Sequence, residues 1–368
     1  NIMSARGGGP NVFEFLWCDP DLEPEPPVEL PLSKIFSHTD WGVLRSGWND
    51  KAGTLFALKG GQKDWDHYHH DTNHFALWSN GKPLITDLLY PHVIWGCETE
   101  AHNTVKVNEK DQRGVVRLQG CRGNPDHRGV LGGMIDTPDY SRLVGDASLA
   151  YETEDVNSFL REVIYLRETD NSSEYFVLFD DIDTTDAYPI DWHLNTYGNI
   201  DISGGQTTFS LGDAAVDVDL VTPKAFRHTI QTRTLEESGA PGPFEGAECI
   251  KTLGIRPNEP TNRTFILSVL SPRGSHDPRR LMVESLVGKN AAGTRVLQKE
   301  VEDTFVFALE DPEAEAGGIS FTGRTAFVRR IDGKTSLAAL HNGQSLSVDG
   351  QCLFETDGCG HAVVRYSG

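Results

Sequence analysis

The stretch "HFALWSNGKPLITDLLY", residues 74–90, decides the fold class. Its two apolar runs have the length and composition of short β-strands. Between them stands an Asn-Gly pair at 80–81, and these two residue types tolerate the positive φ angles that a two-residue hairpin turn requires. The stretch is therefore predicted to be an antiparallel β-hairpin.

The same pattern extends along the chain in both directions, with short apolar or alternating runs separated by Gly, Asn and Pro. The clearest runs are 41–48, 53–61, 102–108, 159–168, 174–183, 190–198, 207–221, 263–272, 294–310 and 334–355. No sustained amphipathic helix interrupts them, and only 277–288 is predicted as a short helix or connector. The sequence predicts an all-β fold, a large antiparallel β-sandwich of two layers with a smaller C-terminal β domain.

Three segments are predicted from composition. Residues 1–31 end in the proline- and acid-rich "CDPDLEPEPPVELP", which sustains neither a helix nor a central strand and is interpreted as a linker leaving an upstream domain. Residues 32–276 are assigned to the large sandwich, and 277–368 to the smaller C-terminal β-sheet domain.

Composition narrows the function. The 368 residues carry a net charge of −21, which opposes nucleic acid and anionic membranes as partners because both require a basic surface. No apolar run has the length of a membrane span. The six cysteines form no Cys-x-x-Cys pair and are interpreted as buried or loop thiols, with one bridge at most.

The candidate site begins at "DHYHHDTNHF", residues 66–75, which holds four of the thirteen histidines. Strand alternation places His67, His69 and Asp71 on one face, and His70 and His74 on the other as surface or packing groups. Asp71 is predicted to orient a histidine or cap a turn.

A metal-binding group is predicted from His69, Asp87 and His102, which stand at the ends of three strands that one antiparallel sheet can bring together. Two neutral imidazoles and a carboxylate suit a borderline cation such as zinc. Two alternatives remain at this point. The cluster could be a polar surface turn, or the two-histidine, one-carboxylate iron site of a cupin-type oxygenase.

The order of motifs resembles the heparinase II/III-like polysaccharide lyases. The resemblance lies in His-x-His-x-Asp at 67–71, a Gly-Lys-Pro hairpin at 81–83, the following Asp87, and "AHNTVKVNEKDQ" at 101–112. It continues into "GVLRSGW", "FLREVIYLRETDNSSEYFVLFDDID" and "DWHLNT". Two departures are visible, because Leu89 replaces the usual glycine after Asp87 and no arginine precedes His102.

The resemblance implies a two-part enzyme in which an N-terminal α/α toroid precedes β-sheet domains and the active site lies between them. This chain would be the β part, inactive without its toroid. His69, Asp87 and His102 would bind a structural zinc ion, Zn²⁺, His67 would face the substrate, and the bacterial periplasm or exterior would be the favoured location.

The implied reaction is β-elimination from a uronic-acid polymer, either a heparan-type glycosaminoglycan or alginate. A base removes the C5 proton and an acid protonates the leaving oxygen. His67 and Tyr90 are the candidate catalytic residues, and Asn103 and Arg113 are the candidate substrate-binding residues. A non-catalytic carbohydrate-binding sandwich with a zinc site is the remaining alternative.

Trp192 and His193 in "DWHLNT" point to opposite faces of one predicted strand. One of them is therefore expected in the core, and the other toward the substrate cleft.

Overall fold

The protein is described by a computed structural model for residues 25, 27–48, 53–61, 66–87, 94–114, 121–122, 125–203, 205–234 and 249–366. Contacts divide the chain into two compact units, Asn1–Pro31 and Leu32–Gly368. The predicted linker falls almost entirely outside the described residues. All the described strands belong to the second unit.

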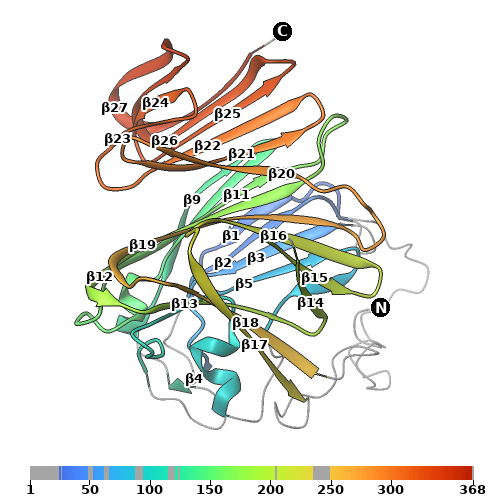
Figure 1. Ribbon diagram of the computed structural model, residues 1–368, viewed down its shortest axis with the longest axis vertical. Helices are drawn as coiled ribbons and strands as arrows, with labels where there is room; N and C mark the ends of the chain where they lie inside the picture. The colour runs from blue at the N-terminus through green and yellow to red at the C-terminus, as the bar shows by residue number, and fades with distance from the viewer. Residues whose placement is uncertain are drawn as a thin grey trace. The chain divides into compact units, whose positions relative to one another are not determined.

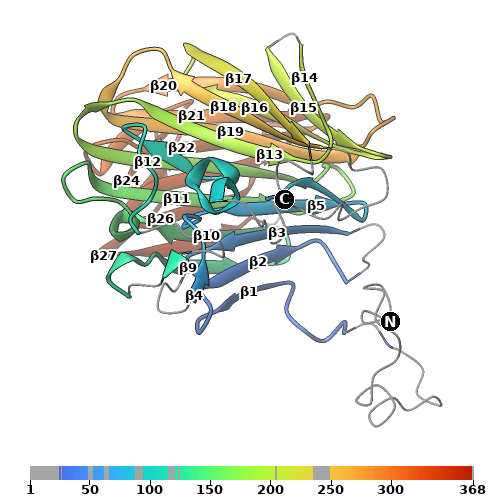
Figure 2. The same cartoon turned by 90° about the horizontal axis from the view of Figure 1, so that it is seen from below.

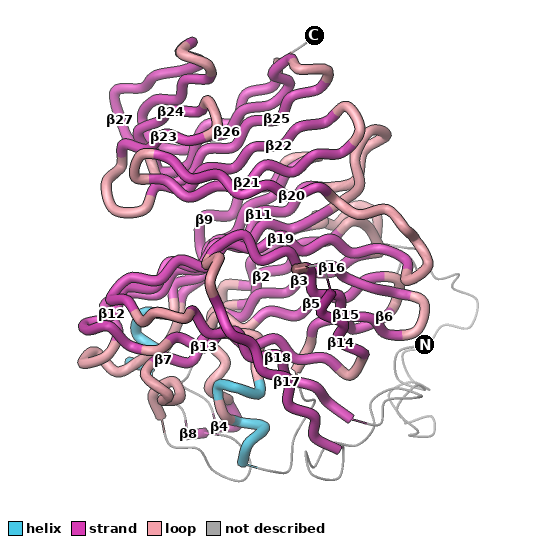
Figure 3. Tube along the Cα trace, in the orientation of Figure 1, coloured by secondary structure: helices cyan, strands magenta, loops and turns pink. Residues whose placement is uncertain are grey.

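The predicted all-β antiparallel fold is confirmed, and Figure 3 shows the described chain as strand and loop with only short helical turns. These turns are η2 (Ile94–Cys97), η3 (Thr99–Ala101), η4 (Pro125–His127) and η5 (Ser148–Ala150). None of the helices in the described ranges has the length and hydropathy that crossing a membrane would take.

The predicted hairpin lies in a five-stranded sheet of order β1-β2-β3-β5-β6. Asn80 and Gly81 have φ angles of 51° and 69°, as a two-residue turn between paired antiparallel strands requires. Figure 2 shows β1, β2, β3 and β5 side by side. The strands are β1 (Ser33–Phe36), β2 (Trp41–Arg45), β3 (Thr54–Lys59), β5 (Phe75–Ser79) and β6 (Lys82–Ile85).

A four-stranded sheet, β17-β18-β13-β7, continues the same side of the sandwich core, and the pair β4-β8 stands apart from it. The strands are β7 (Val105–Val107), β13 (Ile190–Thr196), β17 (Phe226–Thr234), β18 (Cys249–Pro257), β4 (Asp66–Tyr68) and β8 (Cys121–Arg122). Trp192 is fully buried in the core whereas His193 is on the opposite face, so the predicted alternation of these two residues is confirmed.

The central sheet has eight strands in the order β14-β15-β16-β19-β12-β11-β10-β9. They are β9 (Val130–Asp136), β10 (Tyr140–Asp146), β11 (Val156–Leu166), β12 (Tyr175–Tyr188), β14 (Asn199–Ser203), β15 (Gln206–Leu211), β16 (Ala214–Thr222) and β19 (Thr261–Gly274). One of its faces packs against the five- and four-stranded sheets in a shared hydrophobic core. This packing is the predicted sandwich.

The last sheet contains eight strands that follow one another from residue 282 to residue 365. They are β20 (Met282–Gly288), β21 (Ala291–Gln298), β22 (Val301–Ala308), β23 (Glu313–Ala316), β24 (Ile319–Thr322), β25 (Thr325–Ile331), β26 (Lys334–Val348) and β27 (Gln351–Arg365). The helix considered for 277–288 is wrong, because 282–288 pairs with β21 as a strand. Cys352 and Cys359 in β27 are free thiols, so they form no bridge.

The C-terminal sheet packs on the second face of the central sheet, as Figure 1 shows for the orange and red strands beside β9, β11 and β19. Phe179 stacks on Phe307 with ring centroids 4.2 Å apart, and both are buried. The central strands β11 and β12 are therefore covered on both faces. The boundary predicted after residue 276 falls in the connection between β19 and β20.

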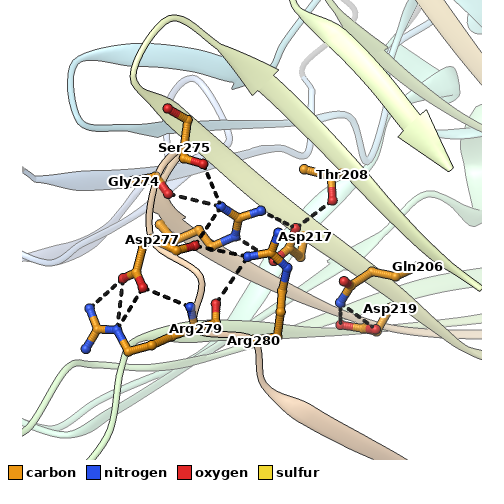
Figure 4. Close-up of polar contacts among 10 residues, drawn as sticks. Gln206, Thr208, Asp217, Asp219, Gly274, Ser275, Asp277, Arg279 and Arg280 are labelled. Atoms are coloured by element: carbon orange, nitrogen blue, oxygen red, sulfur yellow. Dashed lines mark hydrogen bonds and ion pairs between the residues drawn. The ribbon is translucent and has the colours of Figure 1, made fainter. Parts of the chain in front are cut away.

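That connection is fastened to β16 by Asp217, which is fully buried (Figure 4). Its two carboxylate oxygens accept from Arg273 Nε and Nη2 at 2.7 and 2.9 Å, and Arg280 Nε lies 3.0 Å away. Thr208 donates a further bond at 2.7 Å. The Asp217 charge is thus shared by two arginines, and this cluster holds three strands and a loop together.

Asp219, drawn beside Asp217 in Figure 4, gives a first prediction. Burial raises the pKa of its carboxyl to about 6, and the Asp217 carboxylate adds to the rise while Gln206 Nε2 opposes it from 3.1 Å. The folded state therefore binds a proton that the unfolded state releases near pH 4, so stability falls as pH rises from about 4 to 6. Asp219→Asn should raise the free energy of unfolding by up to about 2 kcal/mol at pH 8, with the gain disappearing toward pH 4.

Thermal unfolding of both proteins across this pH range measures the effect. Asp213→Asn, at an exposed position nearby, should change little. An Asp219→Asn protein less stable than the parent at pH 8 contradicts the prediction.

Candidate functional site

Four segments converge at one end of the sandwich and carry the predicted site. His69 follows β4 directly, and His74 directly precedes β5. Asp87 lies two residues beyond the end of β6, and His102 caps the short helix η3 three residues before β7. The sheet pairings and the hairpin therefore bring together side chains that are far apart in sequence.

His102 is the centre of the cluster and is fully buried. Its Nδ1 lies 3.1 Å from Asp87 Oδ2. Two ligands of one tetrahedral zinc ion, with bonds of about 2.0–2.2 Å, would lie about 3.3 Å apart, so this spacing fits a shared metal. The other ring nitrogen, Nε2, is buried without a hydrogen-bond partner in the described chain.

His69 and Asp71 complete one side of the cluster. The ring centroid of His69 lies 5.2 Å from that of His102, and ligand atoms of these two histidines and Asp71 all fall within 4.8 Å of one another. The buried Asp71 carboxylate forms a close ion pair with Lys59 on β3. Its charge is thus already matched by a protein cation.

His74 is placed differently from the prediction, which put it on the far side with His70 as a surface or packing group. Both are buried, with 2% of each residue exposed, but His74 lies within the cluster, its Nε2 3.7 Å from Asp87 Oδ2. The chain leaves the extended conformation after β4, and Asn73 has a φ of 59°, so strand alternation does not extend to His74.

The hydrogen bonds of His74 decide what it can do. The backbone N–H of Asn103 donates to His74 Nδ1 at 2.9 Å. A neutral imidazole that accepts at Nδ1 carries its proton on Nε2, which faces Asp87. His74 therefore directs an N–H toward Asp87 from 3.7 Å and has no free lone pair for a metal.

The protonation states suit a cation. Burial, together with the neighbouring His102, lowers the pKa of His69 to about 4, and burial does the same for His74. Burial alone would raise the pKa of Asp87, but His74 and His102 hold it down to about 2. Neutral imidazoles beside ionised carboxylates are the form that binds zinc, so these residues fit the metal that the resemblance implies.

Arg161 on β11 supports the backbone next to the cluster, a role that the sequence did not suggest. The guanidinium is fully buried and holds Asp180 on β12 through bonds of 2.7 and 2.6 Å. Its Nη1 donates to the carbonyl oxygen of Asn73 and, at 2.8 Å, to that of Asn103. These two residues adjoin His74 and His102, so a single side chain ties both segments together.

The other predicted site residues have varied positions. Asn103 is fully buried, donating to the Phe75 carbonyl at 2.7 Å and accepting from the Asn195 N–H at 2.6 Å. Arg113 is partly buried and pairs with Glu152 at 3.2 Å. The backbone of His67 lies in β4, but its side chain is outside what the structure describes, as is the whole of Tyr90.

These observations define the class of protein. It has a three-layered β fold with a buried histidine–aspartate cluster at one end of the sandwich. The family model described as "Heparinase II/III-like, C-terminal" matches residues 29–242, more than half of the chain. The chain belongs to this family.

Solved structures share the fold at low sequence identity. The heparinase III-BT4657 gene product has a TM-score of 0.58 and 18% identity, and heparan sulfate lyase HepC from Pedobacter heparinus has 0.57 and 13%. Each match covers 76% of this chain and 43% of the solved chain. A further heparinase III structure has a TM-score of 0.56 and 17% identity. This chain therefore spans less than half the length of these structures.

Proposed function

We propose that this chain is the β-sheet portion of a polysaccharide lyase that cleaves a uronic-acid-containing polymer of the heparan type by β-elimination. The observation that carries the proposal is a cluster of histidines and aspartates in a chain of the heparinase II/III-like family, in which His102 lies within ligand range of His69 and Asp71 on one side and of His74 and Asp87 on the other. An N-terminal α/α domain would complete the active site and supply further substrate contacts. Without it, this chain would show little or no activity.

We assign the metal to His69, Asp87 and His102. These are the residues that the family resemblance implies. The ion pair of Asp71 with Lys59 and the bond that His74 Nδ1 accepts from Asn103 favour them over the other two side chains of the cluster. The metal, when bound, would be zinc in a structural role that fixes the segment between β4 and β5. Asn103 serves as a positioning residue, because its amide joins β5 to β13 beneath His102.

His67 is the proposed base on the β side. In β-elimination the base takes the C5 proton, the C5–H electrons form the C4=C5 double bond, and the C4–O bond breaks. The C5 proton is acidic enough only when donors or cations stabilise the charge that builds on the neighbouring carboxylate. Tyr90 would protonate the leaving oxygen, and Arg113 would bind a substrate anion.

The direct test is His67→Ala in the natural full-length protein. Loss of a positioned general base should lower turnover by about 10²–10⁴-fold. Metal content should remain unchanged, because His67 is not among the assigned ligands. Initial rates from the ultraviolet absorbance of the C4=C5 bond, with metal analysis of the same samples, give both quantities.

His38→Ala, at an exposed histidine, is the matched control and should keep full activity. Full activity in His67→Ala, or joint loss of rate and metal, contradicts the assignment.

A substrate screen tests the function as a whole. The full-length protein should form unsaturated uronate from at least one of heparan sulfate, chondroitin sulfate, hyaluronan, alginate and ulvan. Bound iron with oxygen-dependent turnover would instead establish the oxygenase alternative. A folded, metal-loaded protein inert toward every polymer would leave the carbohydrate-binding alternative.

A further inference from the structure

A cavity of about 380 Å³ lies on the outer face of the four-stranded sheet, away from the sandwich core. The residues that line this cavity are not those of the metal cluster. The cavity is lined by residues of all four strands, by Glu100 in η3 and by Glu109 just after β7.

The register of the strands places the residues that line this cavity in rows across the sheet. His193 on β13 lies opposite Gly254 on β18, and Gly254 lies opposite Thr229 on the edge strand β17. A Cβ atom on Gly254 would lie 3.0 Å from Thr229 Oγ1 and 3.6 Å from the His193 ring. Gly254 has no positive φ that would require glycine, so its small size serves to keep the middle of the row open.

His193 is the second observation that indicates a ligand. Only 8% of it is exposed, yet it lines the cavity, and the ring edge that carries Cδ2 and Nε2 is the one nearest the open space over Gly254. Burial lowers its pKa to about 4, despite the opposing effect of Asp191, so the ring is neutral and offers one donor and one acceptor. Nε2 is therefore the ring atom that a ligand in the cavity would meet.

Among the described residues, the acids of the cavity are paired and one of its cations is left over. The acids are held by arginines, since Arg256 contacts Asp191 at 2.5 Å and Glu109 at 3.1 Å, and Arg233 contacts Glu100 at 3.0 Å.

The exposed Arg227, by contrast, has no ion pair or hydrogen bond among the described residues. Arg227 and Lys106 stand at the two ends of the adjacent row, since Arg227 lies opposite Arg256 and Lys106 lies opposite Asp191. Lys106 pairs with Asp111 at 3.6 Å and with Glu100 at 4.0 Å. Three strand spacings of about 4.8 Å separate these two cations by roughly 14 Å, a span suited to a short anionic oligosaccharide.

We infer that this cavity is a binding subsite for an acidic sugar, whose carboxylate or sulfate pairs with Arg227 and whose hydroxyl groups bond to His193 and Thr229 above Gly254. The inference rests on the proposed function, because a uronate polymer presents both groups on each repeat. The cavity adjoins the metal cluster along the chain, since the His193 N–H donates to the carbonyl of Thr104, two residues after His102.

The test is equilibrium binding of two tetrasaccharides to the metal-loaded natural full-length protein by calorimetry. One is unsulfated, with glucuronate and N-acetylglucosamine alternating, and the other is its sulfated counterpart. To prevent turnover, the parent for all variants carries His67→Ala. Loss of one charge-assisted hydrogen bond in Arg227→Gln should weaken binding by about tenfold. Gly254→Ala should weaken it similarly by closing the open space.

Arg279→Gln is the matched control, because it removes the same charge from an exposed arginine outside this cavity and should leave the affinity unchanged. A greater loss for the sulfated sugar assigns Arg227 to sulfate, and an equal loss assigns it to carboxylate. Unchanged binding in both cavity variants, an equal loss in the control, or a parent that binds neither sugar overturns the inference.

The result of this binding test can be distinguished from the result of testing the proposed function. A cavity-dependent affinity, when the protein with His67 intact forms no unsaturated product, would keep the subsite and reject the lyase. Product formation with an affinity that ignores both cavity variants would do the reverse.

Discussion

Replacing His102 by alanine is expected to empty the metal centre and lower the stability of the fold in one step. His102 is fully buried, its Nδ1 faces Asp87 at 3.1 Å, and its ring lies against those of His69 and His74. A metal present at about a thousand times its Kd adds about 4 kcal/mol to the free energy of unfolding. The variant should lose about this amount and bind close to no metal.

Chelation provides the matching experiment on the unaltered protein. A chelator should lower the melting temperature of the wild type and leave that of His102→Ala unchanged, because the variant has no metal to lose. Asp71→Asn should keep the metal, since Lys59 and not the cation is the proposed partner of Asp71. Metal retained in His102→Ala, or a wild type indifferent to chelation, would falsify the assignment.

The sequence was sufficient where local chemistry sets the structure. The Asn80-Gly81 turn requires positive φ angles, and both residues have them. Asp87 and His102 are neighbours, because the hairpin and the strand ends that follow it leave little freedom in where these side chains lie.

The predicted position of His74 is wrong because strand alternation does not hold beyond the point where the strand ends. Asn73 adopts a left-handed conformation at φ 59°, which turns His74 back toward Asp87. Asparagine is among the residues that tolerate this region, so the sequence carried a signal that period-two counting ignores.

The third layer of the fold was also missed. Residues 163–166 and 175–179 are buried without interruption, as expected for strands covered on both faces. The nearly continuous apolar runs in this part of the sequence indicate such strands. The prediction of a two-layered sandwich nevertheless leaves one of their faces uncovered. The sheet that covers them begins more than 100 residues later, and no local pattern relates the two.

Arg161 could not be found from sequence because its partners are two backbone carbonyl groups and a carboxylate on other segments. Yet its position predicts a second large effect. Arg161→Met should cost about 3–5 kcal/mol, since it leaves the Asp180 carboxylate buried without its cation. It should also weaken metal affinity about 10–100-fold, because the segments next to His74 and His102 lose their common support.

Two further variants separate these effects. Arg329→Met breaks an equally buried pair, Arg329–Asp303, in the C-terminal sheet. It should destabilise the protein comparably and leave metal affinity alone. Arg161→Met combined with Asp180→Leu removes the stranded charge, so much of the lost stability should return while metal affinity stays weak. Denaturant unfolding and metal titration measure both quantities, and equal metal affinities in Arg161→Met and Arg329→Met would show that Arg161 supports the fold without positioning the site.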